Sequence, residues 1–106
     1  MINELEARLA TLAAQRDVIT YGKLAAELGL DGPGRIARLT TALETLMVQY
    51  TAVGRPLRAA LVVGRATGGL PARGFFEKAQ ALGHDVSDAV GFHRAQLSAC
   101  FGPVAG

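Results

Sequence analysis

Apolar residues at helical spacing predict the first helix. Leu5, Leu9 and Leu12 lie at i, i+4 and i+7, which places them in one stripe along a helix surface. Asn3 is a suitable N-cap before this stripe, and the helical pattern ends near residues 15–16. We therefore expect an amphipathic helix at the start of the chain, with its leucines facing the core.

A second and a third helix follow, separated by a glycine-rich turn. Thr20 is a good N-cap for a helix over residues 21–28, and Gly29 stands where a helix C-terminal glycine belongs. Pro33 fits the first turn of a third helix, which the pattern carries to about Val53. The apolar positions of this helix keep a helical period: Ile36, Leu39, Leu43, Leu46, Met47 and Tyr50.

The second half of the chain alternates short apolar runs with turn residues. Residues 59–63 read AALVV, which predicts a buried strand, and residues 18–19 suffice only for an extended link or a brief strand. Gly64–Gly74 is a loop rich in glycine and arginine. Two further helices are expected: residues 75–82, and a last helix from Ser87 or Asp88 to about Phe101.

These elements predict a single domain that is mainly α-helical with a short β element. A chain of 106 residues is in the usual size range for one hydrophobic core, and half of its residues are apolar. The expected class is winged-helix-like, a helix-turn-helix with a degenerate wing. Within residues 1–106, the parts are a helix-turn-helix core at about 20–53, a strand and wing-like loop at about 58–74, and C-terminal helices at 75–101.

Composition and the N-terminal segment indicate a cytoplasmic protein. Cys100 is the single cysteine, so no internal disulfide can form, as expected of a chain kept in a reducing compartment. The segment MINELEARLATLAAQR has acids near its start and no long apolar run, which argues against a signal peptide or a membrane span. We therefore expect a soluble protein without a membrane partner. Its richness in Ala, Gly and Arg is typical of a GC-rich bacterial genome.

Charge is distributed unevenly along the chain, although the net charge is only +2. The segment from residue 35 to residue 73 holds six arginines and a single acid, Glu44, and is therefore +5. The remainder has five basic and eight acidic residues, or −3. The six arginines are Arg35, Arg38, Arg55, Arg58, Arg65 and Arg73. Such a distribution favours an acidic partner, and the alternative is an ordinary solvated face.

A short helix, a glycine-containing turn and a longer helix form the pattern of a helix-turn-helix. In such modules the second helix enters the DNA major groove with its N-terminal residues at the base edges. Arg35 and Arg38 lie one turn apart at that end and are expected to share a face. Lys23, Arg65 and Arg73 would contact phosphates, the last two from the wing. The alternatives are a helical core with solvated arginines and a plain connecting loop.

Three segments, TYGKLAAELGL, GPGRIARLTTAL and TGGLPARGFFEKAQALG, resemble the C-terminal winged-helix domain of O6-alkylguanine-DNA alkyltransferases and alkyltransferase-like proteins. The resemblance covers residues 19–82, and YGKLA is its clean match. It implies that Tyr21 lies near a flipped nucleotide and that Arg35 is the candidate for the arginine that replaces a flipped base. Where the family has Pro-Cys-His-Arg, this chain reads VVGR at residues 62–65, so alkyl transfer to a thiol there is excluded.

The remaining reactive side chains are His84, His93 and Cys100. His93 and Cys100 are seven residues apart on a predicted helix and share a face, so a Cys-His pair is one interpretation. The other interpretation is a buried small thiol and a surface histidine. The chain has no metal-ligand spacing such as CxxC or HExxH. We therefore predict no catalytic residue, no metal site and no cofactor.

The function expected from these patterns is non-catalytic binding of double-stranded DNA. The expected contacts are Tyr21, Lys23, Arg35, Arg38, Arg65 and Arg73. The alternative is a protein-interaction or homodimerisation module that presents the loop 64–74 and the pair Phe75–Phe76, of which one ring is expected to pack inward. An enzyme that uses Cys100 and His93 is the third interpretation.

Overall fold

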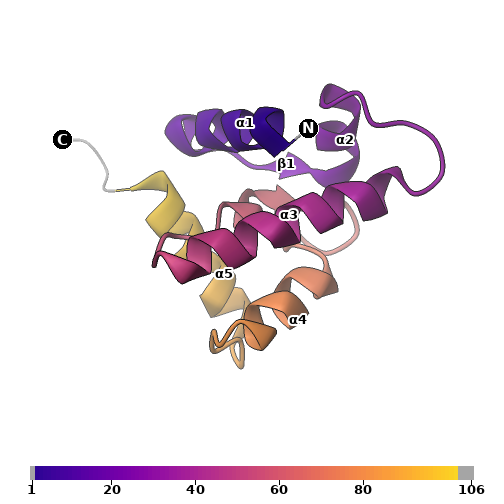
Figure 1. Ribbon diagram of the computed structural model, residues 1–106. Coiled ribbons are helices and arrows are strands. Elements are labelled where there is room, and N and C mark those ends of the chain that lie inside the picture. Colours follow the sequence, from indigo (N-terminus) through magenta and orange to yellow (C-terminus); the bar gives the residue numbers. More distant parts are fainter. Residues whose placement is uncertain (1, 103–106) are drawn as a thin grey trace.

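The computed structural model describes residues 2–102, and Figure 1 shows its helices arranged around a short inner segment. In chain order the elements are α1 (Ile2–Gln15), β1 (Ile19–Thr20), α2 (Tyr21–Glu27), α3 (Arg35–Ala52), the 3-10 helix η1 (Arg58–Leu61), β2 (Val62–Val63), α4 (Arg73–Ala81) and α5 (Ala89–Phe101). The expected domain ends at residues 1 and 103–106 lie outside the described range. The prediction of a mainly helical protein with a short β element is confirmed.

The inner segment consists of η1 and β2, and η1 contacts α1, α3 and α5. Ala59, Ala60, Leu61 and Val62 are all buried. The small side chains of the two alanines let the surrounding helices approach this segment closely. The stripes predicted for the first and third helices are buried in the same core: Leu5, Leu9 and Leu12 from α1, and Leu39, Leu43, Leu46, Met47 and Tyr50 from α3.

The two short strands form a parallel sheet, in which Ile19 pairs with Val62 and Thr20 pairs with Val63. This pairing brings the start of α2 to the end of η1, because Thr20 is also the N-cap of α2. The expected strand over residues 59–63 is wrong in its first part, which is helical in η1. A short apolar run does not by its periodicity distinguish a buried strand from a buried helical turn.

Two predicted helix starts are wrong. α1 begins one residue before Asn3, so this side chain lies inside the helix and does not cap it. α3 begins at Arg35 rather than Pro33, because Gly34 has a φ of 79°, in the left-handed region that a right-handed helix cannot include. The first turn of α3 projects beyond the core (Figure 1), and Ile36, expected in the core, is 37% exposed.

The last two helices follow the prediction closely. α4 begins at Arg73, two residues earlier than expected, and ends at Ala81. α5 starts after Asp88, whose carboxylate accepts a hydrogen bond from the Gly91 N–H at 3.0 Å, as an N-cap does. No helix within residues 2–102 combines the length and the apolar character needed to cross a bilayer.

Candidate nucleic-acid interface

The site predicted for nucleic acid is built on α2 and the start of α3. The Thr20 hydroxyl accepts a hydrogen bond from the Lys23 N–H at 3.3 Å, which fixes the first turn of α2. The helix ends two turns later, where the Leu30 N–H donates to the Ala25 carbonyl at 2.9 Å and Gly29 takes a φ of 74°. Lys23 is exposed, and its ammonium group has no partner within residues 2–102.

The α2–α3 turn, residues 29–34, is stabilised by a side chain of the following helix. Gly32 and Gly34 both have positive φ, 76° and 79°, and every residue from 31 to 38 is exposed. The Arg38 guanidinium folds back over this turn. Its Nη2 donates to the Asp31 carbonyl at 2.7 Å, and its Nη1 donates to the Pro33 carbonyl at 3.4 Å.

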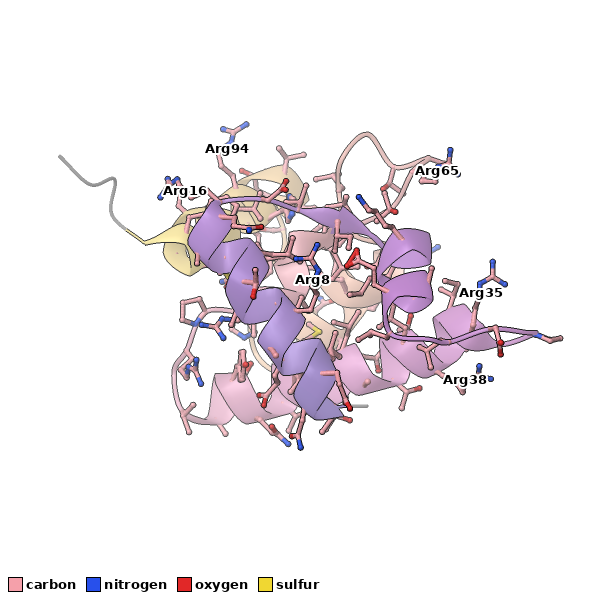
Figure 2. The ribbon with its side chains drawn as sticks, turned by 90° about the horizontal axis from the view of Figure 1, so that it is seen from above. Arg8, Arg16, Arg35, Arg38, Arg65 and Arg94 are labelled. Atoms are coloured by element: carbon pink, nitrogen blue, oxygen red, sulfur yellow. The ribbon has the colours of Figure 1, made fainter. Side chains whose placement is uncertain are left out.

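Arg35 and Arg38 do not share a face, although their spacing predicts that they do. Figure 2 shows the two side chains on opposite sides of the α3 start. Arg38 is turned toward the turn carbonyls, whereas Arg35 is exposed and its guanidinium has no partner in the described part of the chain. The two residues differ by only about 60° in direction around the helix, and the hydrogen bonds to the Asp31 and Pro33 carbonyls turn the Arg38 side chain further away from Arg35.

The loop after β2 presents the third cation. The Gly64 N–H donates to the Leu70 carbonyl at 2.9 Å, and the Thr67 hydroxyl donates to the Gly64 carbonyl at 3.2 Å, so the ends of the loop are held together. Arg65 is exposed on this loop, with no hydrogen bond or ion pair to the rest of the described chain. α2 contacts both β2 and α3, and Figure 2 shows Arg65 and Arg35 at one edge of the molecule.

The three exposed cations without a partner in the described chain are Lys23 on α2, Arg35 on α3 and Arg65 on the loop after β2, and we call this set the basic surface. One acidic residue of α2 is neutralised nearby, because Glu27 Oε1 lies 2.8 Å from Arg8 Nε on α1. Asp31 is exposed in the adjoining α2–α3 turn. Figure 2 places Arg94, on α5, and Arg16, next to α5, away from this edge.

Arg73 lies on α4 and is not one of the unpartnered cations. Its Nε is 3.9 Å from Glu77 Oε1, one turn along the same helix, and the two side chains are 91% and 65% exposed. Such an exposed pair is weak. Arg73 follows Ala72, whose N–H donates to the Tyr21 hydroxyl at 3.0 Å, so it is connected to the start of α2.

Tyr21 joins α2 to the start of α4. Its ring is half-buried, and desolvation raises its pKa above the usual value, although the hydrogen bond from Ala72 opposes this shift. The ring lines a cavity of about 30 Å³ together with Leu43, Met47 and Phe75. Because a single water needs about 10–15 Å³, the cavity has room for about two waters and is too small for a nucleobase.

The first two residues at the position of the alkyltransferase Pro-Cys-His-Arg motif are apolar in this chain. Val62 and Val63 are buried in β2, so no nucleophile stands where the resemblance would put the thiol. Of the pair Phe75–Phe76, the first ring is buried and the second is half-buried against it, edge to face at 5.2 Å. The inward packing of one ring is confirmed, and little aromatic surface is left for stacking on a base.

His93 and Cys100 face the backbone of the inner segment. His93, predicted at the surface, is buried, and its Nε2 donates to the Ala60 carbonyl at 2.9 Å. Cys100 is half-buried, and its Sγ donates to the Leu57 carbonyl at 3.5 Å. Desolvation raises the pKa of this thiol to about 11, although the charge of Arg58 opposes the shift. Both side chains are thus engaged with backbone carbonyls, and the thiol is poorly suited to act as a nucleophile.

Two kinds of side-chain hydrogen bond, one in the α2–α3 turn and one between α5 and Leu57, have no signal in the sequence. Arg38 bonds to backbone carbonyls up to seven residues earlier, and Gln96 accepts a hydrogen bond from the Leu57 N–H at 2.8 Å. Because the partners are backbone groups, no particular residue type marks these contacts in the sequence.

Residues 2–102 contain no group of three or more His, Cys, Asp or Glu side chains placed to hold a metal ion. Comparisons of the chain with protein-family models, with curated proteins and with solved structures find no match.

Proposed function

We propose that this protein binds double-stranded DNA without catalysing a reaction, through the basic surface of Lys23, Arg35 and Arg65. In this proposal the arrangement is winged-helix-like: α3 is the recognition helix, and the loop over residues 64–70 is a degenerate wing. Arg73 is an additional phosphate contact at the rim. Tyr21 acts through the position of α2 and α4, because its hydroxyl is already bonded to Ala72.

The observation that carries the proposal is the lack of partners for three cations on elements that contact one another or directly follow one that does. Lys23, Arg35 and Arg65 come from α2, α3 and the loop after β2, and all three are exposed without an ion pair in residues 2–102. An unpaired cation can contact a DNA phosphate without breaking an ion pair within the protein. Each such contact releases condensed counterions from the DNA, which favours binding. The first turn of α3 adds backbone N–H groups, which also favour a phosphate.

The proposal is tested by binding to a short duplex over a salt series. The three phosphate contacts of the basic surface predict a log–log slope of affinity against salt of about −2.7, and Arg73 at the rim brings it to about −3.6. Each single alanine substitution at Lys23, Arg35 or Arg65 lowers the magnitude of the slope by about 0.9. The matched control is Arg94→Ala, which removes the same charge from the exposed surface of α5 (Figure 2).

Arg94→Ala is expected to leave the slope unchanged. Absence of binding at low salt would refute the proposal. It would also be refuted if Arg94→Ala lowered the slope as much as Arg35→Ala, because attraction would then depend on net charge and not on the basic surface.

A second candidate function, self-association or protein binding, is favoured by the outer face of α3. Val48 on this helix is 43% exposed, and Val53, which directly follows its last residue, is 68% exposed. The hydroxyls of Thr41 and Thr45 donate to carbonyls of their own helix at 3.0 and 3.1 Å, which leaves their methyl groups toward solvent. A native mass of two chains by light scattering, reduced to one by Val48→Asp, would support this function instead.

A further inference from the structure

The Arg38 guanidinium is occupied by the α2–α3 turn. It donates to the carbonyls of Asp31 and Pro33, at 2.7 and 3.4 Å, from two different nitrogens. Within the described chain, no other side chain donates a hydrogen bond to the carbonyls of residues 29–34. The planar fork of an arginine suits two acceptors at once, which a lysine ammonium does not match.

The turn depends on such a contact because little else orders it. Gly29, Gly32 and Gly34 all have positive φ, and none has an atom within 4 Å of the place where a Cβ would be. α3 has no side-chain cap, and the Arg35 N–H donates to the Gly32 carbonyl at a long 3.4 Å. A glycine-rich, exposed chain has many competing conformations.

We propose that Arg38 is a positioning residue: it holds the α2–α3 turn in the conformation that directs Arg35 outward, and it does not itself bind phosphate. This role deepens the proposed DNA binding and rests on it for its biological purpose. The geometric part, stabilisation of the turn, stands without DNA. The two carbonyls that Arg38 bonds, those of Asp31 and Pro33, lie just before the start of α3. Loss of these hydrogen bonds would therefore let the backbone at Arg35 move.

The first arm of the test measures the turn in the absence of DNA. Amide hydrogen exchange is followed at Leu30 and Arg35, whose N–H groups donate to Ala25 and Gly32. Arg38→Ala is expected to speed exchange roughly tenfold, the effect of losing charge-assisted hydrogen bonds. Arg65→Ala removes an equal charge away from the turn and is expected to leave both rates unchanged. Unchanged rates in Arg38→Ala overturn the proposal.

The second arm measures duplex affinity against salt for Arg38→Ala, Arg38→Lys and Arg35→Ala. Arg35→Ala is expected to lower the magnitude of the log–log slope by about 0.9, whereas both Arg38 variants weaken binding with the slope retained. A lower slope in Arg38→Ala that Arg38→Lys restores identifies a phosphate contact and overturns the proposal. If the wild-type chain binds no duplex, the proposed function fails, and the exchange arm still decides the role of Arg38 in the turn.

Discussion

Three side chains of α5 satisfy backbone groups of the buried inner segment and of Leu57, the residue directly before it. His93 bonds to the Ala60 carbonyl, while Gln96 and Cys100 bond to the N–H and the carbonyl of Leu57. Each buried backbone group left unpaired would cost about 1–3 kcal/mol. The i, i+7 spacing of His93 and Cys100 suggests a reactive pair in the sequence. In the structure these two side chains, together with Gln96, attach α5 to the irregular segment.

His93→Ala is expected to lower the free energy of unfolding by about 2–4 kcal/mol, because it leaves the Ala60 carbonyl unpaired and opens a cavity. Urea denaturation measures this loss. The control is His84→Ala: this half-buried side chain is hydrogen-bonded to the Thr51 hydroxyl at 2.9 Å, and its loss is expected to cost about 1 kcal/mol. Equal losses in the two variants would contradict the role assigned to His93.

Cys100 is expected to react slowly with thiol reagents. Burial raises its pKa from the ordinary 9.0 to about 11, so the thiolate fraction near pH 8 falls roughly 100-fold. The rate is compared with the same chain unfolded in urea, where the thiol is exposed. Labelling at the same rate in the folded and unfolded chain would show that the thiol is not held against the Leu57 carbonyl.

The same shift in the pKa of Cys100 lowers the free energy of unfolding at alkaline pH. An exposed thiol keeps the ordinary pKa of 9.0, so the unfolded chain releases this proton at lower pH than the folded chain does. The contribution of Cys100 to the free energy of unfolding is therefore constant below about pH 9 and falls as the pH rises through about 11. Cys100→Ala is expected to lose less stability than the wild type between pH 8.5 and 10, as measured by urea denaturation.

At the scale of the elements, caps and periodic stripes were the predictable part. Thr20 and Asp88 cap α2 and α5 as their side-chain chemistry predicts, and the leucine stripe of α1 is buried. The helical first part of the run AALVV was not predictable, because a short apolar run fits a strand and a helical turn equally well, and the Ala60 carbonyl bonds to His93, far along the chain. For the candidate site, exposure of Arg35 followed from its charge, whereas the direction of Arg38 depended on backbone acceptors that no residue pattern encodes.

The start of α3 gives a prediction with a matched control. Gly34→Ala places a Cβ at a φ of 79° and is expected to destabilise the protein by about 1 kcal/mol or more. Gly22 is helical in α2 with nothing within 4 Å of its Cβ position, so Gly22→Ala is expected to add about 0.5 kcal/mol. Opposite shifts in melting temperature check both values, and a stabilising Gly34→Ala would contradict the left-handed turn.

For the whole molecule, Arg16 connects the first helix to the last. Its Nη1 donates to the carbonyls of Phe101 and Gly102 at 3.2 and 3.3 Å, and its guanidinium lies 5.3 Å from the Phe101 ring centre. The backbone of Arg16 has a φ of 56°, which is unfavourable for a residue with a side chain. A cross-molecule contact is thus made from a strained position at the end of α1.

Two substitutions at this position separate the contact from the strain. Arg16→Ala loses the contact and keeps the strain, whereas Arg16→Gly loses the contact and releases the strain. We therefore expect Arg16→Gly to be the more stable of the two by about 1 kcal/mol in urea denaturation. Faster hydrogen exchange at the Gly102 N–H is expected in both variants, since that group belongs to the last turn of α5. A less stable Arg16→Gly would contradict the strain.

The placement of η1 in the interior has a consequence for how quickly the chain reaches its native state. The segment near residue 60 contacts helices from both ends of the described chain, and β1 pairs with β2 across more than forty residues. Partners in the hydrogen bonds of Tyr50 to Glu6 and of Arg16 to Phe101 are 44 and 85 residues apart. Helical proteins usually fold fast because sequence neighbours pack first. Here long loops must close before the core forms, so refolding is expected at the slower rates of mixed α/β domains.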